Sequence, residues 1–473
     1  MNIERNLSAI AVLALIASPL FATAKPIERP NVLFIAVDDL RPELNCYGQP
    51  LIQSPNIDRL ASEGLQFNRA YCQVPVCGAS RASLLSGIRP SRDRFVTYHT
   101  RLDEDLPGVV SLPGIFRDHG YTTISNGKIY HHRTDDAKSW DEVWHPKATN
   151  VSKWRDYQTR ENIDLAAESR STGFPYEKAD LGDDAYFDGK IASKSMADLR
   201  KLSAGGDPFF LAVGFLKPHL PFNAPSNYWD LYSKEEIQLA ENPFPPAGSP
   251  KEAMHRFGEL RAYRGIPEKG PVDDAMALEM THGYYACVSY TDAQIGRVID
   301  ELDRLGLREN TIVILWGDHG WHLGEHGLWC KHCNFEKVMR VPMILNAPGY
   351  PAAGVTEALV ELVDIYPTLT ELCGLPHPDH LHGTSMVPLL EDPIAPFKDA
   401  VYSRWYDGET VITDRFIYTE WLDKDRRAYA RMLYDLDSDP GENINVSELP
   451  ENKALVERMS DLLQDNDTIV QGN

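Results

Sequence analysis

The segment Val76–Arg81, which reads V-C-G-A-S-R, places Cys77 and an arginine at the start of an expected helix over residues 81–87. The N-terminus of a helix presents unpaired N–H groups and the positive end of the helix dipole, which favour an anion there. Arg81 would add a fixed positive charge. Because a single cysteine is more often a small buried thiol, the chemistry of Cys77 depends on its neighbours.

Carboxylates follow two expected buried strands, Asn31–Val37 and Thr311–Trp316. Asp38 and Asp39 come directly after the first strand, and Asp318 follows the second after one glycine. Open α/β sheets place their ligand sites at the carboxyl ends of strands. Adjacent carboxylates repel each other unless a cation separates them, and Ca²⁺ or Mg²⁺ prefers oxygen ligands. The pattern indicates a metal site, and a solvated acidic turn is the alternative.

Three further segments contribute lysine and histidine. Lys128 and His131 lie in G-K-I-Y-H, and His219 lies in K-P-H-L-P-F after an expected strand over residues 208–215. Lys331 lies within W-C-K-H-C-N-F. A histidine suits proton transfer because its ordinary pKa lies near neutral pH. In isolation, G-K-I-Y-H would be interpreted as a solvated loop.

The order of these motifs along one chain resembles that of type I, formylglycine-dependent sulfatases, whose signature C-x-[P/A]-S-R matches C-G-A-S-R. The runs L-L-S-G-I-R-P-S (84–91), K-P-H-L-P-F (217–222) and D-H-G-W-H-L-G-E-H-G (318–327) are similar to the iduronate-2-sulfatase-like branch. The likeness extends from residues 31–42 to residues 434–443. One departure is Ala79, where many family members have proline, and it raises the question of which enzyme matures Cys77.

The resemblance implies that Cys77 is converted to formylglycine (3-oxoalanine), whose hydrated aldehyde is the nucleophile. It also implies one Ca²⁺ per chain. The implied calcium ligands are Asp38, Asp39, Cys77 (through an oxygen of the modified side chain), Asp318 and His319. Imidazole is the least typical calcium ligand among them, and many arylsulfatases have asparagine in place of His319. The implied catalytic residues are Cys77, Arg81, Lys128, His131, His219 and Lys331.

The resemblance also gives these residues roles. The metal and Arg81 would activate one hydroxyl of the hydrate, while Lys128 and Lys331 would stabilise the sulfate oxygens. His219 would protonate the departing alcohol, and His131 would take a proton from the second hydroxyl to expel sulfate. The expected partners are a sulfated carbohydrate and either a formylglycine-generating or an anaerobic sulfatase-maturating enzyme.

Three functions fit the sequence. The first is a sulfuric ester hydrolase that removes O-sulfate from a sugar of a glycosaminoglycan or an algal glycan such as ulvan, fucan or carrageenan. The second is a phosphatase or phosphonate hydrolase of the same superfamily. The third is a sulfated-glycan-binding protein with an inactive site. Neither the sugar and sulfate position nor exo or endo action can be read from the sequence.

The amino-acid composition narrows the class of protein to which this chain can belong. Of the 473 residues, 43% are hydrophobic and 25% charged, which is ordinary for a globular enzyme. The formal net charge of −22 argues against nucleic-acid binding and requires local cations for an anionic substrate. Residues 1–24 have an apolar run and end in A-T-A, so we expect a signal peptide and export to the periplasm or medium. No stretch predicts a membrane span.

The expected fold is α/β, alkaline-phosphatase-like, with a large mixed sheet flanked by helices. We expect a catalytic domain over residues 25–388 and a C-terminal α+β subdomain over residues 389–473, with a small antiparallel sheet and a helix. The expected helices are 275–307, 361–373 and 451–463, the C-terminal strands are 400–405, 410–421 and 431–436, and the insertions over the site are 138–200 and 228–271.

The seven cysteines have irregular spacing and predict no disulfide framework. Cys330 and Cys333 form a C-x-x-C motif, which occurs in redox sites and in halves of zinc sites. No second C-x-x-C accompanies it, so a local disulfide or two plain thiols is the simpler interpretation.

Overall fold

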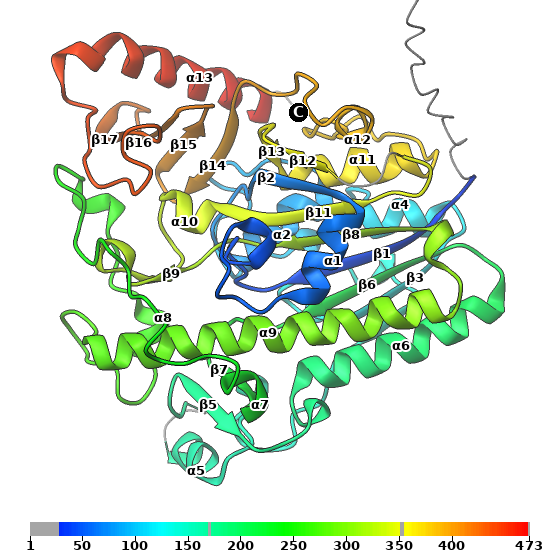
Figure 1. Cartoon of the computed structure of the whole chain (residues 1–473). Coiled ribbons are helices and arrows are strands. Elements are labelled where there is room, and N and C mark those ends of the chain that lie inside the picture. Colours follow the sequence, from blue (N-terminus) through cyan, green and yellow to red (C-terminus); the bar gives the residue numbers. More distant parts are fainter. Residues whose placement is uncertain (1–27, 169–171, 351–353, 472–473) are drawn as a thin grey trace, which may run out of the picture.

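The computed structural model describes residues 28–168, 172–350 and 354–471. Its centre is a nine-stranded mixed sheet in the order β12-β2-β11-β8-β1-β6-β3-β4, with β13 beside β2 (Figure 1). The strands are β12 (Gly354–Thr356), β2 (Leu65–Tyr71), β11 (Arg340–Asn346), β8 (Thr311–Gly317), β1 (Asn31–Val37), β6 (Phe209–Phe215), β3 (Thr122–Gly127), β4 (Glu142–Trp144) and β13 (Val360–Glu361). The expected α/β class is confirmed, and the expected signal peptide lies outside the described residues.

Strand β1 lies in the middle of the sheet, parallel to β6 on one side and β8 on the other. All seven of its residues are buried, because helices cover both faces of the sheet. Alternate residues of β1 belong to two different apolar clusters, as the two-residue period of a strand requires. This double burial explains why the β1 sequence is apolar throughout.

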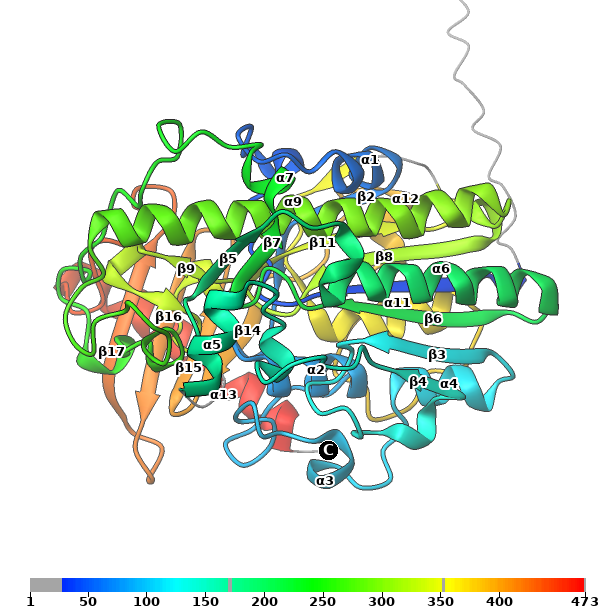
Figure 2. The same ribbon diagram turned by 90° about the horizontal axis from the view of Figure 1, so that it is seen from below.

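Two groups of helices form these faces. One face packs against α1 (Pro55–Glu63), α6 (Phe187–Gly205) and α9 (Asp274–Arg304). The other packs against α2 (Cys77–Ser86), α4 (Leu112–Asp118), α11 (Ile365–Leu372) and α12 (Val387–Glu391). Figure 2 shows α6 and α9 running beside each other over the sheet. The expected helices over 275–307 and 361–373 correspond to α9 and α11, although α11 begins four residues later than expected, after a 3-10 turn.

The C-terminal part is an antiparallel sheet with strand order β14-β15-β16-β17, covered by helix α13 (Lys453–Gln471). Its strands are β14 (Val401–Trp405), β15 (Gly408–Ile412), β16 (Phe416–Leu422) and β17 (Ala428–Asp435). The prediction of a single strand over 410–421 is therefore wrong. Thr413 closes a hairpin turn by donating its N–H to the Phe416 carbonyl, 2.9 Å away. The polar run Thr-Asp-Arg is the turn signal within that segment.

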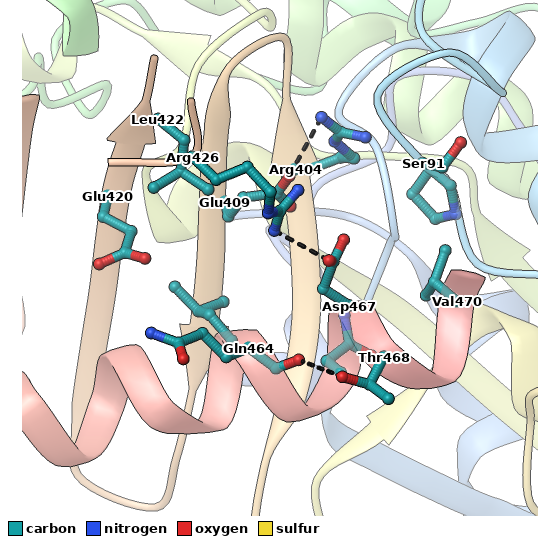
Figure 3. A pocket seen from close by; sticks show the side chains of 13 residues that line it. Ser91, Arg404, Glu409, Glu420, Leu422, Arg426, Gln464, Asp467, Thr468 and Val470 are labelled. Carbon is teal, nitrogen blue, oxygen red and sulfur yellow. Dashed lines mark hydrogen bonds and ion pairs between the residues drawn. The ribbon is translucent and has the colours of Figure 1, made fainter. Parts of the chain in front are cut away.

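A cavity of about 360 Å³ lies between this sheet and α13 (Figure 3). Arg404 on β14 and Glu409 on β15 form an ion pair of 3.1 Å there. Arg426, in the β16–β17 turn, pairs with Asp467 of α13 at 2.9 Å. The second pair joins the helix to the sheet across the cavity.

The expected insertion over 138–200 is partly wrong, because its last 14 residues belong to α6, with Ile191 and Leu199 buried in the core. The apolar stripe of α6 is narrow, and the many lysines and serines of this segment make it hard to recognise in the sequence. Residues 228–271, in contrast, contain only short helical turns.

The remaining short elements are α3 (Leu102–Asp105), α5 (Arg160–Glu168), α7 (Ser226–Trp229), α8 (Gly258–Arg261), α10 (Glu336–Met339), β5 (Tyr176–Ala179), β7 (Phe222–Pro225), β9 (His322–Leu323) and β10 (Trp329–Cys330). No helix in the described ranges has the length and apolar character needed to cross a membrane.

Candidate active site

Four neighbouring parallel strands, β8, β1, β6 and β3, bring the sequence-predicted residues to one edge of the sheet. Asp318 follows β8, Asp38 follows β1, His219 lies four residues after the end of β6 and Lys128 follows β3. Segments that are far apart in the sequence therefore meet because the carboxyl ends of parallel strands lie together. Cys77 faces the same edge from the first position of α2.

The Cys77 side chain is buried, and its Sγ lies 3.3 Å from Nε2 of His319. Burial raises the pKa of the Cys77 thiol well above its ordinary value, and the nearby Asp38 carboxylate raises it further. The positive charges of Lys128 and Lys331 do not outweigh these effects. As an unmodified residue, Cys77 is therefore a protonated and weak nucleophile.

Three carboxylates and three cationic side chains surround Cys77. They are Asp38, Asp39, Asp318, Arg81, Lys128 and Lys331. The guanidinium of Arg81, which is fully buried, lies 2.7 Å from Asp318 and 3.3 Å from Asp38. The Lys128 ammonium contacts the other oxygen of Asp38, and Lys331 lies 3.2 Å from Asp39. Arg81 thus holds the carboxylates in place.

These pairings determine the protonation of the acidic pair. Burial opposes ionisation of Asp38, but Lys128, His219 and Arg81 outweigh it and hold the pKa of Asp38 well below its ordinary value. Burial raises the pKa of Asp39, and the nearby cations only partly offset this effect. The two neighbouring carboxyl groups are therefore not equivalent.

The donor set fits a hard divalent cation. One oxygen each of Asp38 and Asp318, Cys77 Sγ and a His319 nitrogen lie within 4.8 Å of one another, and a second such group joins Asp38 and Cys77 to Asp39 and His219. Carboxylate oxygens are the ligands that calcium prefers. Asp39 also has a φ of 60°, a strained conformation for a non-glycine residue that is common at functional sites.

His319 is placed to act as a ligand through one nitrogen. Its Nδ1 lies 3.0 Å from the Gly320 carbonyl, which requires the proton on Nδ1. Its Nε2 faces the site and lies 3.3 Å from both Cys77 Sγ and Asp39 Oδ1. The contact with Gly320 fixes the ring, as is usual for histidines that bind a metal, and the assignment of His319 as a calcium ligand stays a prediction.

His219 and Lys331 meet at a residue that sequence reasoning missed. Oε1 of Glu259, on α8, lies 3.1 Å from Nε2 of His219, and its Oε2 lies 3.0 Å from Nζ of Lys331. The other nitrogen of His219 lies 2.6 Å from the Leu220 carbonyl. Glu259 belongs to the expected insertion over 228–271, where no motif marked it.

His131 lies in the same pocket, and its buried Nδ1 has no hydrogen-bond partner among the described residues. Burial and, to a smaller extent, the positive charge of Lys128 together lower the pKa of His131 to about 2. The imidazole is therefore neutral and able to accept a proton.

The pocket has a volume of about 670 Å³ and opens to solvent above Cys77. Residues from both expected insertions form much of its wall, including Trp154, Arg155, Glu259 and Tyr263. A pocket of this size holds a sugar ring rather than a single small anion.

Comparisons with known proteins support the same assignment. A family model described as sulfatase matches residues 30–375, and one described as N-sulphoglucosamine sulphohydrolase, C-terminal, matches residues 324–468. Iduronate 2-sulfatase of Mus musculus is 36% identical over 391 residues, which are 74% of this chain and 69% of that protein.

The chain belongs to the sulfatase family. It lies in the iduronate-2-sulfatase-like branch, and the enzyme class predicted from the sequence is confirmed. A sulfatase of Formosa agariphila is 31% identical over 470 residues, covering 93% of this chain and 87% of that one. Members of this family generally use Ca²⁺ and formylglycine.

Solved structures confirm the fold of this sulfatase. A protein in complex with its substrate D-glucosamine-2-N,6-O-disulfate aligns with a TM-score of 0.76 at 21% identity, covering 94% of this chain and 99% of that one. The phosphonate monoester hydrolase of Agrobacterium radiobacter aligns with a TM-score of 0.75 at 22% identity, covering 92% and 95%. At such identities the likeness concerns the fold alone.

The C-x-x-C motif of this sulfatase is not a disulfide. Cys330 and Cys333 are both buried free thiols. Among the described residues, neither cysteine belongs to a group of side chains that could hold a metal ion. The interpretation as two plain thiols is confirmed.

The position of Lys128 depends on two glycines, and this dependence can be tested. Gly214 of β6 pairs with Gly127 of β3, and a Cβ on Gly214 would overlap the Lys128 carbonyl. We expect Gly214→Ala to lower the free energy of unfolding by about 1–3 kcal/mol and to reduce sulfatase activity. Denaturant unfolding and a rate assay measure both. Gly205→Ala, where no atom lies within 4 Å, is the control and should leave activity unchanged.

Proposed function

We propose that this sulfatase removes O-sulfate from a sugar of a polysaccharide or oligosaccharide, using formylglycine at position 77. The observation that carries the proposal is the meeting of Cys77, three carboxylates and the Lys128, Lys331 and His219 side chains in one sugar-sized pocket. Relatives named iduronate 2-sulfatase and ulvan-active sulfatase, the latter 27% identical over 455 residues, favour a sulfated glycan.

In the proposed first step, one hydroxyl of the hydrated aldehyde at residue 77 gives its proton to the neighbouring Asp318 carboxylate and attacks sulfur in line with the ester oxygen. A calcium ion held by Asp38, Asp39, Asp318 and His319 would supply positive charge to the sulfate and to the attacking hydroxyl. Lys128 and Lys331 stabilise the sulfate oxygens electrostatically. As the bond between sulfur and the sugar oxygen breaks, His219 donates a proton to that oxygen.

In the second step, His131 takes the proton of the remaining hydroxyl of residue 77. The carbon–oxygen bond to sulfate then breaks, sulfate leaves and the aldehyde is restored. His131 is neutral, as a proton acceptor must be. Arg81 positions Asp38 and Asp318 throughout, and its contacts are with these carboxylates and with backbone carbonyls.

The proposal includes maturation and export. A formylglycine-generating enzyme or an anaerobic sulfatase-maturating enzyme would oxidise Cys77, and the signal sequence at residues 1–24 would direct the chain to the periplasm or the medium. The domain limits expected from the sequence, 25–388 and 389–473, are part of the same proposal.

The deciding experiment compares rates on 4-nitrophenyl sulfate, 4-nitrophenyl phosphate and a panel of sulfated oligosaccharides, with protein matured by each of the two systems. The mass of the peptide containing Cys77 reports whether the thiol has become an aldehyde. Sulfate release from the aldehyde form supports the proposal. Faster phosphate release would favour the phosphatase alternative, and glycan binding without any release would favour the binding protein.

Calcium should stabilise the fold. At a calcium concentration of a hundred times its Kd, we expect the free energy of unfolding to rise by about 2.7 kcal/mol. Asp38→Asn should remove most of this gain, whereas Asp300→Asn, at an exposed carboxylate, should retain it. Thermal unfolding with calcium and with a chelator measures the difference, and a wild-type protein insensitive to both would contradict the calcium assignment.

A further inference from the structure

A 3-10 turn over Lys153–Arg155 reaches the active-site pocket from the insertion that follows β4. Trp154 is 40% exposed, and its ring lies edge-on to the ring of His219, with centroids 5.5 Å apart. An exposed tryptophan beside the proposed proton donor offers an apolar face to a sugar ring.

Arg155, the next residue, is held in a fixed orientation. Its guanidinium lies 4.4 Å from the ring centroid of Trp154 and 5.6 Å from that of Tyr263. Its Nε is buried and has no hydrogen-bond acceptor in the described part of the chain. A buried donor without an acceptor costs free energy, so an acceptor supplied by a ligand would be favourable here.

The charge of Arg155 is also uncompensated. Arg81, Lys128 and Lys331 each form an ion pair with a carboxylate of the site. Arg155 forms no such pair within 4.0 Å among residues 28–168, 172–350 and 354–471. Arg133 and Lys217, which also line the pocket, likewise form no such pair among the described residues, so this wall carries positive charge despite the net charge of −22.

We propose that Trp154 and Arg155 form a subsite for a second anionic group of the substrate. Trp154 packs on the face of a sugar ring, and Arg155 binds a carboxylate or a second sulfate carried by that sugar or its neighbour. This inference rests on the proposed function and adds to it, because one sulfate at residue 77 does not need Arg155.

The test compares wild type, Arg155→Gln and Arg155→Lys on four sulfate esters: 4-nitrophenyl sulfate, a neutral sugar monosulfate, a sulfated uronic acid and a sugar disulfate. We expect Arg155→Gln to lower kcat/KM about 10- to 100-fold on one or both dianionic sugars and to leave the two monoanionic esters within about twofold. Arg155→Lys should recover part of the loss. Lys153→Gln, which removes one exposed charge from the same turn but does not line the pocket, is the matched control.

The pattern of losses identifies the group. A loss confined to the uronic acid assigns the subsite to a carboxylate, and a loss confined to the disulfate assigns it to sulfate. An equal loss on all four esters, or the same loss in Lys153→Gln, overturns the proposal. Calorimetry also measures the affinity of the Cys77→Ala variant for the dianionic sugars, with and without Arg155→Gln. This variant binds without turnover, so the measurement reports on the subsite alone. An enzyme that does not release sulfate would contradict the proposed function, whereas unchanged binding in Arg155→Gln would contradict the subsite. The two outcomes are therefore distinguishable.

Discussion

Replacing Cys77 by serine is expected to reduce sulfate release by about 10⁴-fold or more while leaving the fold intact. Serine has nearly the same shape and would occupy the same buried position, 3.3 Å from His319. It carries one hydroxyl, whereas the aldehyde hydrate carries two. Its hydroxyl could attack sulfur once, but the resulting sulfate ester would have no second hydroxyl to expel the sulfate.

The measurement is multiple-turnover sulfate release, together with the mass of the residue 77 peptide. A trapped sulfate ester on Cys77→Ser would support the two-hydroxyl scheme directly. Cys72→Ser is the matched control, because Cys72 is equally buried but its Sγ contacts the Val338 carbonyl, 3.7 Å away. Multiple turnovers by Cys77→Ser at the wild-type rate would refute the scheme.

Replacing Arg81 by methionine should have the largest effect on stability. Arg81 has no exposed surface, and its loss would leave Asp38 and Asp318 buried with less compensation. Removing one partner of a buried ion pair costs about 3–5 kcal/mol. Because these carboxylates are also the proposed calcium ligands, we expect activity and calcium response to fall with stability.

Denaturant unfolding with and without calcium measures this effect. Arg59→Met is the control, since the pair of Arg59 and Asp300 is exposed and its loss should cost no more than about 1 kcal/mol. An Arg81→Met protein as stable as wild type would show that the buried carboxylates do not depend on the guanidinium. Calcium that restores the stability of Arg81→Met would instead assign the main compensation to the metal.

Much of the site could be predicted because its motifs stand at strand ends. The apolar run of β1 predicted a buried strand, and the carboxyl-end rule then placed Asp38 beside Asp318, which the structure confirms. Helix α9 was predicted because its apolar period is regular over many turns. The chemical role of each residue stays a proposal, since proximity alone does not assign a proton donor.

What the sequence did not reveal depends on tertiary contacts. Glu259, Trp154 and Arg155 lie in irregular segments without a motif, and their importance follows only from what they contact. Helix α6 was missed because its buried stripe is narrow and its lysines dominate the composition. The high pKa of the Cys77 thiol was also unexpected, because the sequence does not show how deeply this residue is buried beside Asp38.

The central position of β1 has a consequence for the timing of folding. Its neighbour β8 is made some 280 residues later, and the His319 side chain that covers the Cys77 sulfur comes 242 residues after it. At roughly 5–20 residues per second, a growing chain would leave that thiol uncovered for roughly 10–50 s. Pairings so distant in sequence also form slowly. The Cys77 thiol is therefore accessible for a period after its synthesis. This period ends when β8 pairs with β1 and completes the sheet.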